Sequence, residues 1–230
     1  MEISFSATGG MWSYMLGIAS VIQNNMKSNT FKFSGVSGGV YSAWFLAYNY
    51  NINEAWNLYF LNSLKELYSI YNLYGLWTYN NIVEKYIYLY INSKDINLNP
   101  GNFCININTL YFDNYYKYIF HSKSELVDCI IASHGLPGIL QPFWKFKTIH
   151  NKYAIDGGIF KTQPKGFQEL QTINIHIRMF RKIPWHWIFP ISSNPNWMNY
   201  LFNLGKQDCL NSMKKYNMDF NLWLKNLNNI

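Results

Sequence analysis

Ser37 lies in a sequence context that could make its hydroxyl group a nucleophile. It is the central residue of Gly35-Val36-Ser37-Gly38-Gly39, a G-x-S-x-G pattern. A β-prone run (31–35) precedes the serine and a helix-compatible run (40–47) follows it. Between a strand and a helix, this pattern predicts a strained turn that exposes the serine, with glycines that let the chain turn and admit a substrate. A tight turn without chemistry is the alternative interpretation.

A serine hydroxyl is a weak nucleophile at its ordinary pKa, so it needs a base to take its proton. Asp156 follows a short expected strand (152–155) and precedes Gly157 and Gly158. Sites in open α/β sheets lie at the carboxyl ends of strands, and glycines leave room for a substrate beside a carboxylate. We therefore hypothesise that Asp156 is the base. An ordinary Asp-Gly turn is the alternative.

Histidine offers another base, in a Ser-Asp-His triad with the chain order of α/β-hydrolases. The candidates are His176, which alternates with Ile175 and Ile177 on an expected strand, and His186, which lies between two tryptophans. We expect His176 to face solvent or a helix and His186 to be superficial. His134, in a turn-rich loop, could help to orient a substrate. We expect each histidine to be structural.

The elements before Ser37 must position it. A first strand (3–6) enters Ala7-Thr8-Gly9-Gly10, and an apolar helix-like segment (11–26) follows. The backbone N–H groups of such a turn can hold a phosphate or a developing oxyanion. The turn has neither the G-x-G-x-x-G pattern nor the lysine of a P-loop, which argues against a nucleotide site. The β-α-β-α order favours a parallel sheet covered by helices.

The rest of the chain continues this alternation in one expected domain, residues 1–230. Two helix-like stretches rich in Tyr, Leu and Trp are interpreted as core, with a lid over an apolar cleft as the alternative. The capping box Ser122-x-x-Glu125 predicts the start of a helix. The expected elements are helices at 52–69, 80–91, 122–131 and from 196 onward, a half-buried strand at 103–109, and a later strand at 172–178.

Composition limits the possible partners and compartments. The 230 residues are 49% hydrophobic and 13% charged, with a formal net charge of +7 that favours an anionic partner, either a phospholipid surface or nucleic acid. No apolar run reaches the roughly 18 residues of a membrane-spanning helix, and the first residues do not resemble a signal peptide. We therefore expect a cytoplasmic protein. Cys104, Cys129 and Cys209 have no metal-like spacing, and we expect buried, reduced thiols.

The segment from Arg178 to Pro190 combines cations with aromatic residues. Its two prolines predict the absence of a regular helix. Trp at a bilayer interface with Arg and Lys toward anionic headgroups would suit an enzyme that acts on lipid. An aromatic loop packed on the sheet is the alternative. Single-stranded nucleic acid could stack on such a segment, but no RNA or DNA motif accompanies it, so no nucleic-acid partner is expected.

Several of these stretches together resemble the patatin-like phospholipases, in the order of that family. Ala7-Thr8-Gly9-Gly10 is similar to the glycine-rich oxyanion loop, Gly35-Val36-Ser37-Gly38-Gly39 to the nucleophile elbow, and Tyr153-Ala154-Ile155-Asp156-Gly157-Gly158 to the Asp-Gly-Gly motif. The stretch from Ala132 to Pro142 is similar to the loop that precedes Asp-Gly-Gly, and Gln163-Pro164 to a later turn. The resemblance covers residues 3–164, leaving a C-terminal strand and helices at 165–230. Ala7 and Thr8 replace glycines of the family loop, which affects loop geometry and substrate fit.

The resemblance implies a three-layer α/β/α sandwich with a mainly parallel sheet and a Ser37-Asp156 dyad. Backbone N–H groups around Thr8, Gly9 and Gly10 would form the oxyanion hole, without a metal or an organic cofactor. The implied activity is that of a lipid acyl hydrolase of the phospholipase A or esterase type, acting on glycerophospholipid as a peripheral protein at a membrane surface. The alternatives are a catalytically idle lipid-binding or scaffold protein and a soluble Ser-Asp-His esterase.

Overall fold

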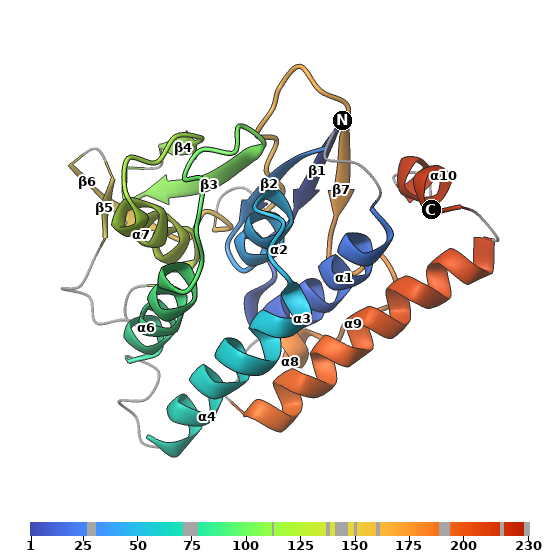
Figure 1. The fold of residues 1–230 in the computed structure, drawn as a ribbon, viewed down its shortest axis with the longest axis horizontal. Coiled ribbons are helices and arrows are strands. Elements are labelled where there is room, and N and C mark those ends of the chain that lie inside the picture. Colours follow the sequence, from blue (N-terminus) through green and yellow to red (C-terminus); the bar gives the residue numbers. More distant parts are fainter. Residues whose placement is uncertain are drawn as a thin grey trace.

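The fold is known from a computed structural model, which describes residues 1–26, 31–70, 78–111, 113–136, 139–140, 147–149, 151–159, 162–188, 194–216 and 219–227. It is a mixed α/β fold with a mostly parallel central sheet and helices packed on it, consistent with the predicted α/β/α fold class (Figure 1). Two of the segments discussed above lie partly outside the described residues. These are the stretch from Ala132 to Pro142, with Pro137 and Gly138, and the segment from Arg178 to Pro190, with Phe189 and Pro190.

Within the described residues the sheet has the strand order β5-β6-β3-β2-β1-β7, with β4 also paired to β3. Four strands run parallel: β1 (Glu2–Phe5), β2 (Lys32–Val36), β3 (Phe103–Thr109) and β7 (Thr172–Ile175). Three antiparallel strands complete the β3 side: β4 (Asn114–Lys117), β5 (Thr148–Ile149) and β6 (Lys152–Ile155). The β-α-β-α order thus predicted the parallel strands at the centre of the sheet but not these antiparallel strands.

The helices of the first half begin close to the predicted positions. A short 3-10 turn, η1 (Gly9–Met11), leads into α1 (Trp12–Asn25), and α2 (Gly39–Ala47) follows β2. The predicted helix at 52–69 is continuous but contains a π-helical turn, with α3 (Ile52–Ala55), η2 (Trp56–Phe60) and α4 (Leu61–Ser69) in succession. The next helices are α6 (Tyr79–Asn92) and α7 (Lys123–His134).

The C-terminal part is helical, as predicted. It consists of α8 (Trp185–Ile188), α9 (Pro195–Tyr216) and α10 (Phe220–Asn226), and α9 runs along α1 (Figure 1). The expectation that prolines keep residues 185–188 from forming a helix is wrong. Pro184 immediately precedes the one-turn helix α8, where its missing N–H group is not needed, and its carbonyl accepts the Trp187 N–H at 3.0 Å.

The two faces of the sheet differ in what covers them. Apolar residues at alternating strand positions join the core between the sheet and the helices. At the positions between them, Gly166 of the segment 162–170 approaches Ser34 and Cys104 and donates to the Glu2 carboxylate at 2.8 Å. Gly157 lies against Asn106 and accepts a hydrogen bond from the Asn108 side chain at 2.9 Å. Every residue of β3 is therefore buried, so the expectation of a half-buried strand is wrong.

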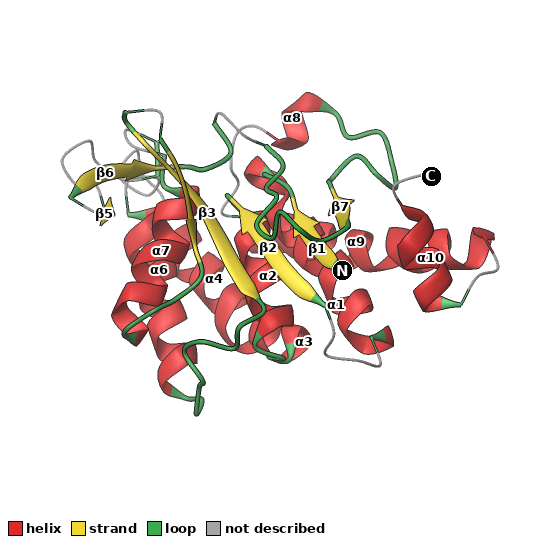
Figure 2. Ribbon diagram, turned by 90° about the horizontal axis from the view of Figure 1, so that it is seen from above, coloured by secondary structure: helices red, strands yellow, loops and turns green. Residues whose placement is uncertain are grey.

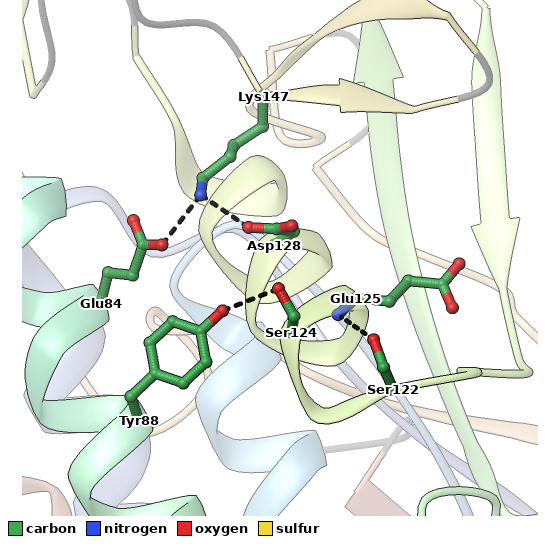
Figure 3. A network of polar contacts seen from close by, with 7 residues as sticks. All are labelled: Glu84, Tyr88, Ser122, Ser124, Glu125, Asp128 and Lys147. Atoms are coloured by element: carbon green, nitrogen blue, oxygen red, sulfur yellow. Dashed lines mark hydrogen bonds and ion pairs between the residues drawn. The ribbon is translucent and has the colours of Figure 1, made fainter.

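The start of α7 is fixed by the predicted cap. Ser122 Oγ accepts the Glu125 N–H at 3.0 Å, while the Glu125 carboxylate accepts the His121 N–H at 2.7 Å. Contacts with α6 and β5 hold the same helix from the side: Tyr88 donates to Ser124, and Lys147 bridges Glu84 and Asp128 (Figure 3). The helix runs to His134, beyond the predicted end at Ile131, and so carries its last residues to the candidate site.

Three further features of the described ranges bear on function. None of their helices has the length and apolarity needed to cross a membrane. They contain no cluster of His, Cys, Asp and Glu of the kind that could hold a metal ion. The three cysteines are free and buried, as predicted, and burial raises the pKa of each thiol.

Candidate active site

Ser37 and Asp156 meet because strands β2 and β6 pair with successive parts of the same edge of β3, and their carboxyl ends point toward each other. On that edge Val36, the last residue of β2, lies opposite Asn106, and Ile155, the last residue of β6, lies opposite Asn108. Strand β4 occupies the other edge of β3 over the same residues. Since β2 is parallel and β6 antiparallel to β3, the residues that follow their carboxyl ends converge.

The two side chains are in direct contact. Ser37 Oγ donates to Asp156 Oδ2 at 2.7 Å, and the other carboxylate oxygen, Oδ1, accepts the Gly158 N–H at 2.6 Å. Both side chains are buried, with 5% of Ser37 and 6% of Asp156 exposed. Ser37 has a φ of +55°, in the left-handed region that side chains other than glycine rarely adopt. Such strain at a buried polar pair is typical of active sites.

Burial gives the Asp156 carboxyl group the properties of a base at neutral pH. Desolvation raises its pKa to about 6, while the hydrogen bonds from Ser37 and Gly158 act in the opposite direction. The carboxyl group is therefore ionised at pH 7, yet it has a higher proton affinity than an exposed aspartate. A carboxylate of this kind can accept a proton from the bonded hydroxyl.

The turn at residues 7–10 lies directly against the serine. A Cβ added to Gly38 would come within 2.1 Å of Thr8 Oγ1, and one added to Gly158 within 2.5 Å of Ala7 Cβ. Gly9, at φ +52°, lines the same cavity as Ser37 and Gly38, whereas Thr8 and Gly10 are buried beside it. The first N–H groups of a helical turn have no partner within the helix. The structure thus brings the three predicted oxyanion residues next to the dyad, with Gly9 at the cavity surface.

The carboxyl end of α7 connects the two halves of the dyad. Ser133 Oγ accepts the Ser37 N–H at 3.1 Å and donates to the Asn106 carbonyl at 2.7 Å, and the Ser133 carbonyl accepts the Gly157 N–H at 2.9 Å. The next carbonyl but one, that of Gly135, accepts the Asp156 N–H at 2.8 Å. Sequence reasoning gave Ser133 no role of its own, although it lies in the stretch that resembles the loop before Asp-Gly-Gly.

A small cavity of about 30 Å³ opens onto the dyad. Its wall is largely aromatic and apolar, formed by Gly9, Trp12, Ser37, Gly38, Tyr41, Tyr79, His134, Leu136, Leu140 and Asp156. The space holds a water molecule or two and is too small for an acyl chain. A larger hollow of about 280 Å³ lies beside the start of α7, but its charged side chains pair in Lys117–Glu125 and Lys147–Asp128 contacts, and it is remote from the serine motif.

His134 is the only predicted histidine that the described structure brings to the cavity. Its Nδ1 donates to the Ile130 carbonyl at 2.8 Å, so Nε2 is the acceptor for the Tyr41 hydroxyl at 3.1 Å. Burial lowers the pKa of His134 to about 4, so the ring is neutral at pH 7. His176 and His186 are exposed and line no part of this cavity, in agreement with the expectation that they are not catalytic.

Comparison with known proteins adds a distant likeness of fold. No protein-family model matches the chain, and no curated protein matches its sequence. Among solved structures, VipD from Legionella pneumophila is similar over 76% of this chain and 49% of its own, with 11% sequence identity and a TM-score of 0.47. The chain thus spans about half the length of VipD. At this identity the likeness concerns the fold alone.

Proposed function

We propose that this protein is a serine acyl hydrolase of the patatin-like type, which cleaves acyl esters of phospholipids with a Ser37-Asp156 dyad. The observation that carries the proposal is the 2.7 Å hydrogen bond from Ser37 Oγ to a buried carboxylate whose pKa is raised to about 6. Apolar and aromatic residues around this pair suit an acyl group. The positive net charge suits the anionic surfaces on which such lipids occur.

In the proposed first half-reaction, Asp156 takes the proton of Ser37 Oγ as this oxygen attacks the ester carbonyl carbon. Backbone N–H groups of the turn at Thr8, Gly9 and Gly10, with that of Gly38 after the nucleophile, stabilise the tetrahedral oxyanion. Each such donor contributes ~3–4 kcal/mol to transition-state stabilisation. The intermediate collapses, the C–O bond to the alcohol breaks, and Asp156 returns the proton to the departing alkoxide.

In the second half-reaction, water attacks the acyl-serine while Asp156 takes one of its protons. Collapse of the second tetrahedral intermediate releases the fatty acid and returns the proton to Ser37 Oγ. No histidine is required, because Asp156 serves as base and acid in turn. Since the cavity is too small for an acyl chain, part of its wall must move when the substrate binds.

Fatty-acid release from mixed phospholipid vesicles tests this proposal. We expect release by the wild type and its loss, by at least ~10³-fold, in Ser37→Ala and Asp156→Asn, because removal of either group eliminates the nucleophile or its base. Matched controls are Ser69→Ala and Asp95→Asn, exposed residues remote from the dyad, which should retain full activity. Circular dichroism verifies folding of each variant.

Three results would contradict the proposal. Release that survives Ser37→Ala would exclude Ser37 as the nucleophile. Release that is lost in His176→Ala or His186→Ala would favour a Ser-Asp-His triad. Vesicle binding by the wild type without any release would identify an idle lipid-binding protein.

A further inference from the structure

Helix α8 joins the candidate active site to the protein surface. At its inner end, Ile188 is buried, and a Cβ added to Gly9 would lie 2.9 Å from both its carbonyl oxygen and its Cγ2 atom. At its outer end, Trp185 is 69% exposed. Figure 2 shows α8 beyond the arrowheads of β1 and β7. Ser37 follows the carboxyl end of the neighbouring parallel strand β2. One helical turn therefore connects the turn beside Ser37 with an exposed indole ring.

The surroundings of Trp185 are basic. The Arg178 guanidinium lies 5.2 Å from the centre of the indole ring, and Lys182 is exposed nearby in the chain. The sequence has no Asp or Glu from Leu170 to Gln207. Arg181 is paired with Asp208, through a bond of 2.8 Å from Nη2, and so contributes little to the surface charge. We use the name α8 face for the exposed residues Arg178, Lys182, Pro184, Trp185 and His186.

Two exposed aliphatic residues lie close in the chain to residues of the site. Ile159 is 48% exposed and lies in the turn that follows Asp156. Its N–H group donates to the Asp156 carbonyl at 3.3 Å. Ile139 is 51% exposed and lies between Leu136 and Leu140 of the cavity wall. Apolar side chains are thus exposed next in the chain to the base and to the cavity wall.

We propose that the α8 face docks on an anionic phospholipid bilayer and turns the dyad toward it. Trp185 would lie at the level of the headgroups, a position that tryptophan favours, while Arg178 and Lys182 contact lipid phosphates. Ile139 and Ile159 would approach the same interface. This proposal rests on the proposed function, since it specifies how that site meets its substrate.

The chemistry of the surface favours lipid over the other anionic partners. Single-stranded nucleic acid is held by aromatic rings that stack on successive bases, whereas isoleucine side chains offer no such platform. A second copy of the chain would bring two faces of like charge together. A bilayer matches all three features, because it accepts the indole ring, the aliphatic side chains and the cations in one plane.

Flotation with phosphatidylcholine vesicles, with and without phosphatidylglycerol, tests the proposal in the inactive Ser37→Ala background. We expect binding only to the anionic vesicles and its weakening by added salt. Loss of both cations in Arg178→Gln/Lys182→Gln should reduce the affinity on the order of twentyfold. Trp185→Ala should reduce it several-fold by removing apolar contact area. Lys65→Gln and Leu89→Ala, exposed residues of α4 and α6, are the matched controls and should bind as the parent does.

The docking surface and the hydrolase can fail independently. With Ser37 present, the α8-face variants should keep wild-type turnover of a water-soluble short-chain ester and lose release from anionic vesicles. Absence of binding by the parent, or equal binding by all variants, would overturn the docking proposal while ester turnover upheld the dyad. Tighter binding to single-stranded RNA at the same residues, or a dimer that these substitutions dissociate, would also overturn it.

Discussion

At the scale of single residues, burial decides what Asp156 can do. Within the described residues, its carboxyl group accepts hydrogen bonds from Ser37 Oγ and the Gly158 N–H group, and these two bonds do not compensate for the loss of water. The same desolvation acts in the opposite direction on His134, whose imidazole it keeps neutral. A charged base and an uncharged ring therefore face one cavity at pH 7.

The pH dependence of activity should report the raised pKa of Asp156. The base must be ionised, and its pKa lies at about 6, so kcat/KM should rise as the pH increases through about 6 and level off above pH 7. His134, with a pKa of about 4, stays neutral across this range. The measurement is kcat/KM for a soluble short-chain ester between pH 4 and 8.

A His134→Gln variant separates the two groups in the same experiment. Because His134 does not titrate near pH 6, the midpoint should be unchanged in this variant even if the rate falls. A midpoint near 4, as for an exposed aspartate, would contradict the assignment of a desolvated base. A midpoint that disappears with His134 would transfer the role to the histidine.

The contact between Ser37 and Asp156 could be anticipated from the sequence, whereas the hydrogen bonds of Ser133 could not. Ser37 and Asp156 each lie beside glycines at the end of an expected strand. Such local patterns can be recognised in the sequence without knowledge of the fold. The role of Ser133 depends on hydrogen bonds to Ser37, Asn106 and Gly157, which are far apart in the chain. Only the packing of α7 against β3 brings these groups together.

At the scale of elements, the carboxyl end of α7 holds the strained turn in place. Ser133→Ala removes the oxygen that accepts the Ser37 N–H group and leaves a buried donor without a partner. We expect kcat to fall about tenfold or more, with KM and the pH midpoint unchanged, because the group positions the nucleophile without touching the substrate. Steady-state kinetics on the soluble ester measures this split.

Conservative and matched variants distinguish positioning from a general loss of structure. Ser133→Thr keeps the hydroxyl group and should recover much of the lost kcat. Ser124→Ala, at the opposite end of the same helix, should leave kcat unchanged. A fall in kcat of equal size in Ser133→Thr and Ser133→Ala, or a shifted pH midpoint, would contradict the positioning role.

Strand β3 shows why burial of an element was harder to predict than its existence. The alternation in Phe103–Thr109 predicts a strand with one solvated face, but Gly166 of the segment 162–170 covers Cys104 and Gly157 covers Asn106 and Asn108. Neither of these covering segments has a periodicity that predicts where it packs. The buried Glu2 carboxylate fixes the segment 162–170 by accepting the Gly166 N–H group. The antiparallel entry of β6, which delivers Asp156, likewise depends on contacts distant in sequence.

At the scale of the whole molecule, helix α9 packs along α1 and completes the fold. The two helices cross at a pair of glycines: a Cβ on Gly17 would lie 2.0 Å from the Phe202 carbonyl oxygen, and one on Gly205 would lie 2.1 Å from that of Tyr14. Next to this crossing, the buried Asp208 of α9 accepts the Tyr14 hydroxyl at 2.8 Å. These contacts tie residues beyond 164 to the element that begins beside the dyad.

Gly205→Ala therefore tests whether residues 1–230 form the one domain that the sequence predicts. The added methyl group cannot fit against backbone atoms, so the helices must separate, and we expect a loss of about 3 kcal/mol in the free energy of unfolding, the upper end of the usual cost of overpacking. Urea unfolding should follow one transition with coincident midpoints by far-ultraviolet circular dichroism and tryptophan fluorescence.

Gly101→Ala is the control: its added Cβ meets nothing within 4 Å, and only its positive φ of +76° opposes the change, by about 1 kcal/mol. Separate midpoints for the two signals would show that α9 and α10 unfold apart from the sheet, and equal losses in the two variants would show that the α1–α9 crossing tolerates a wider spacing.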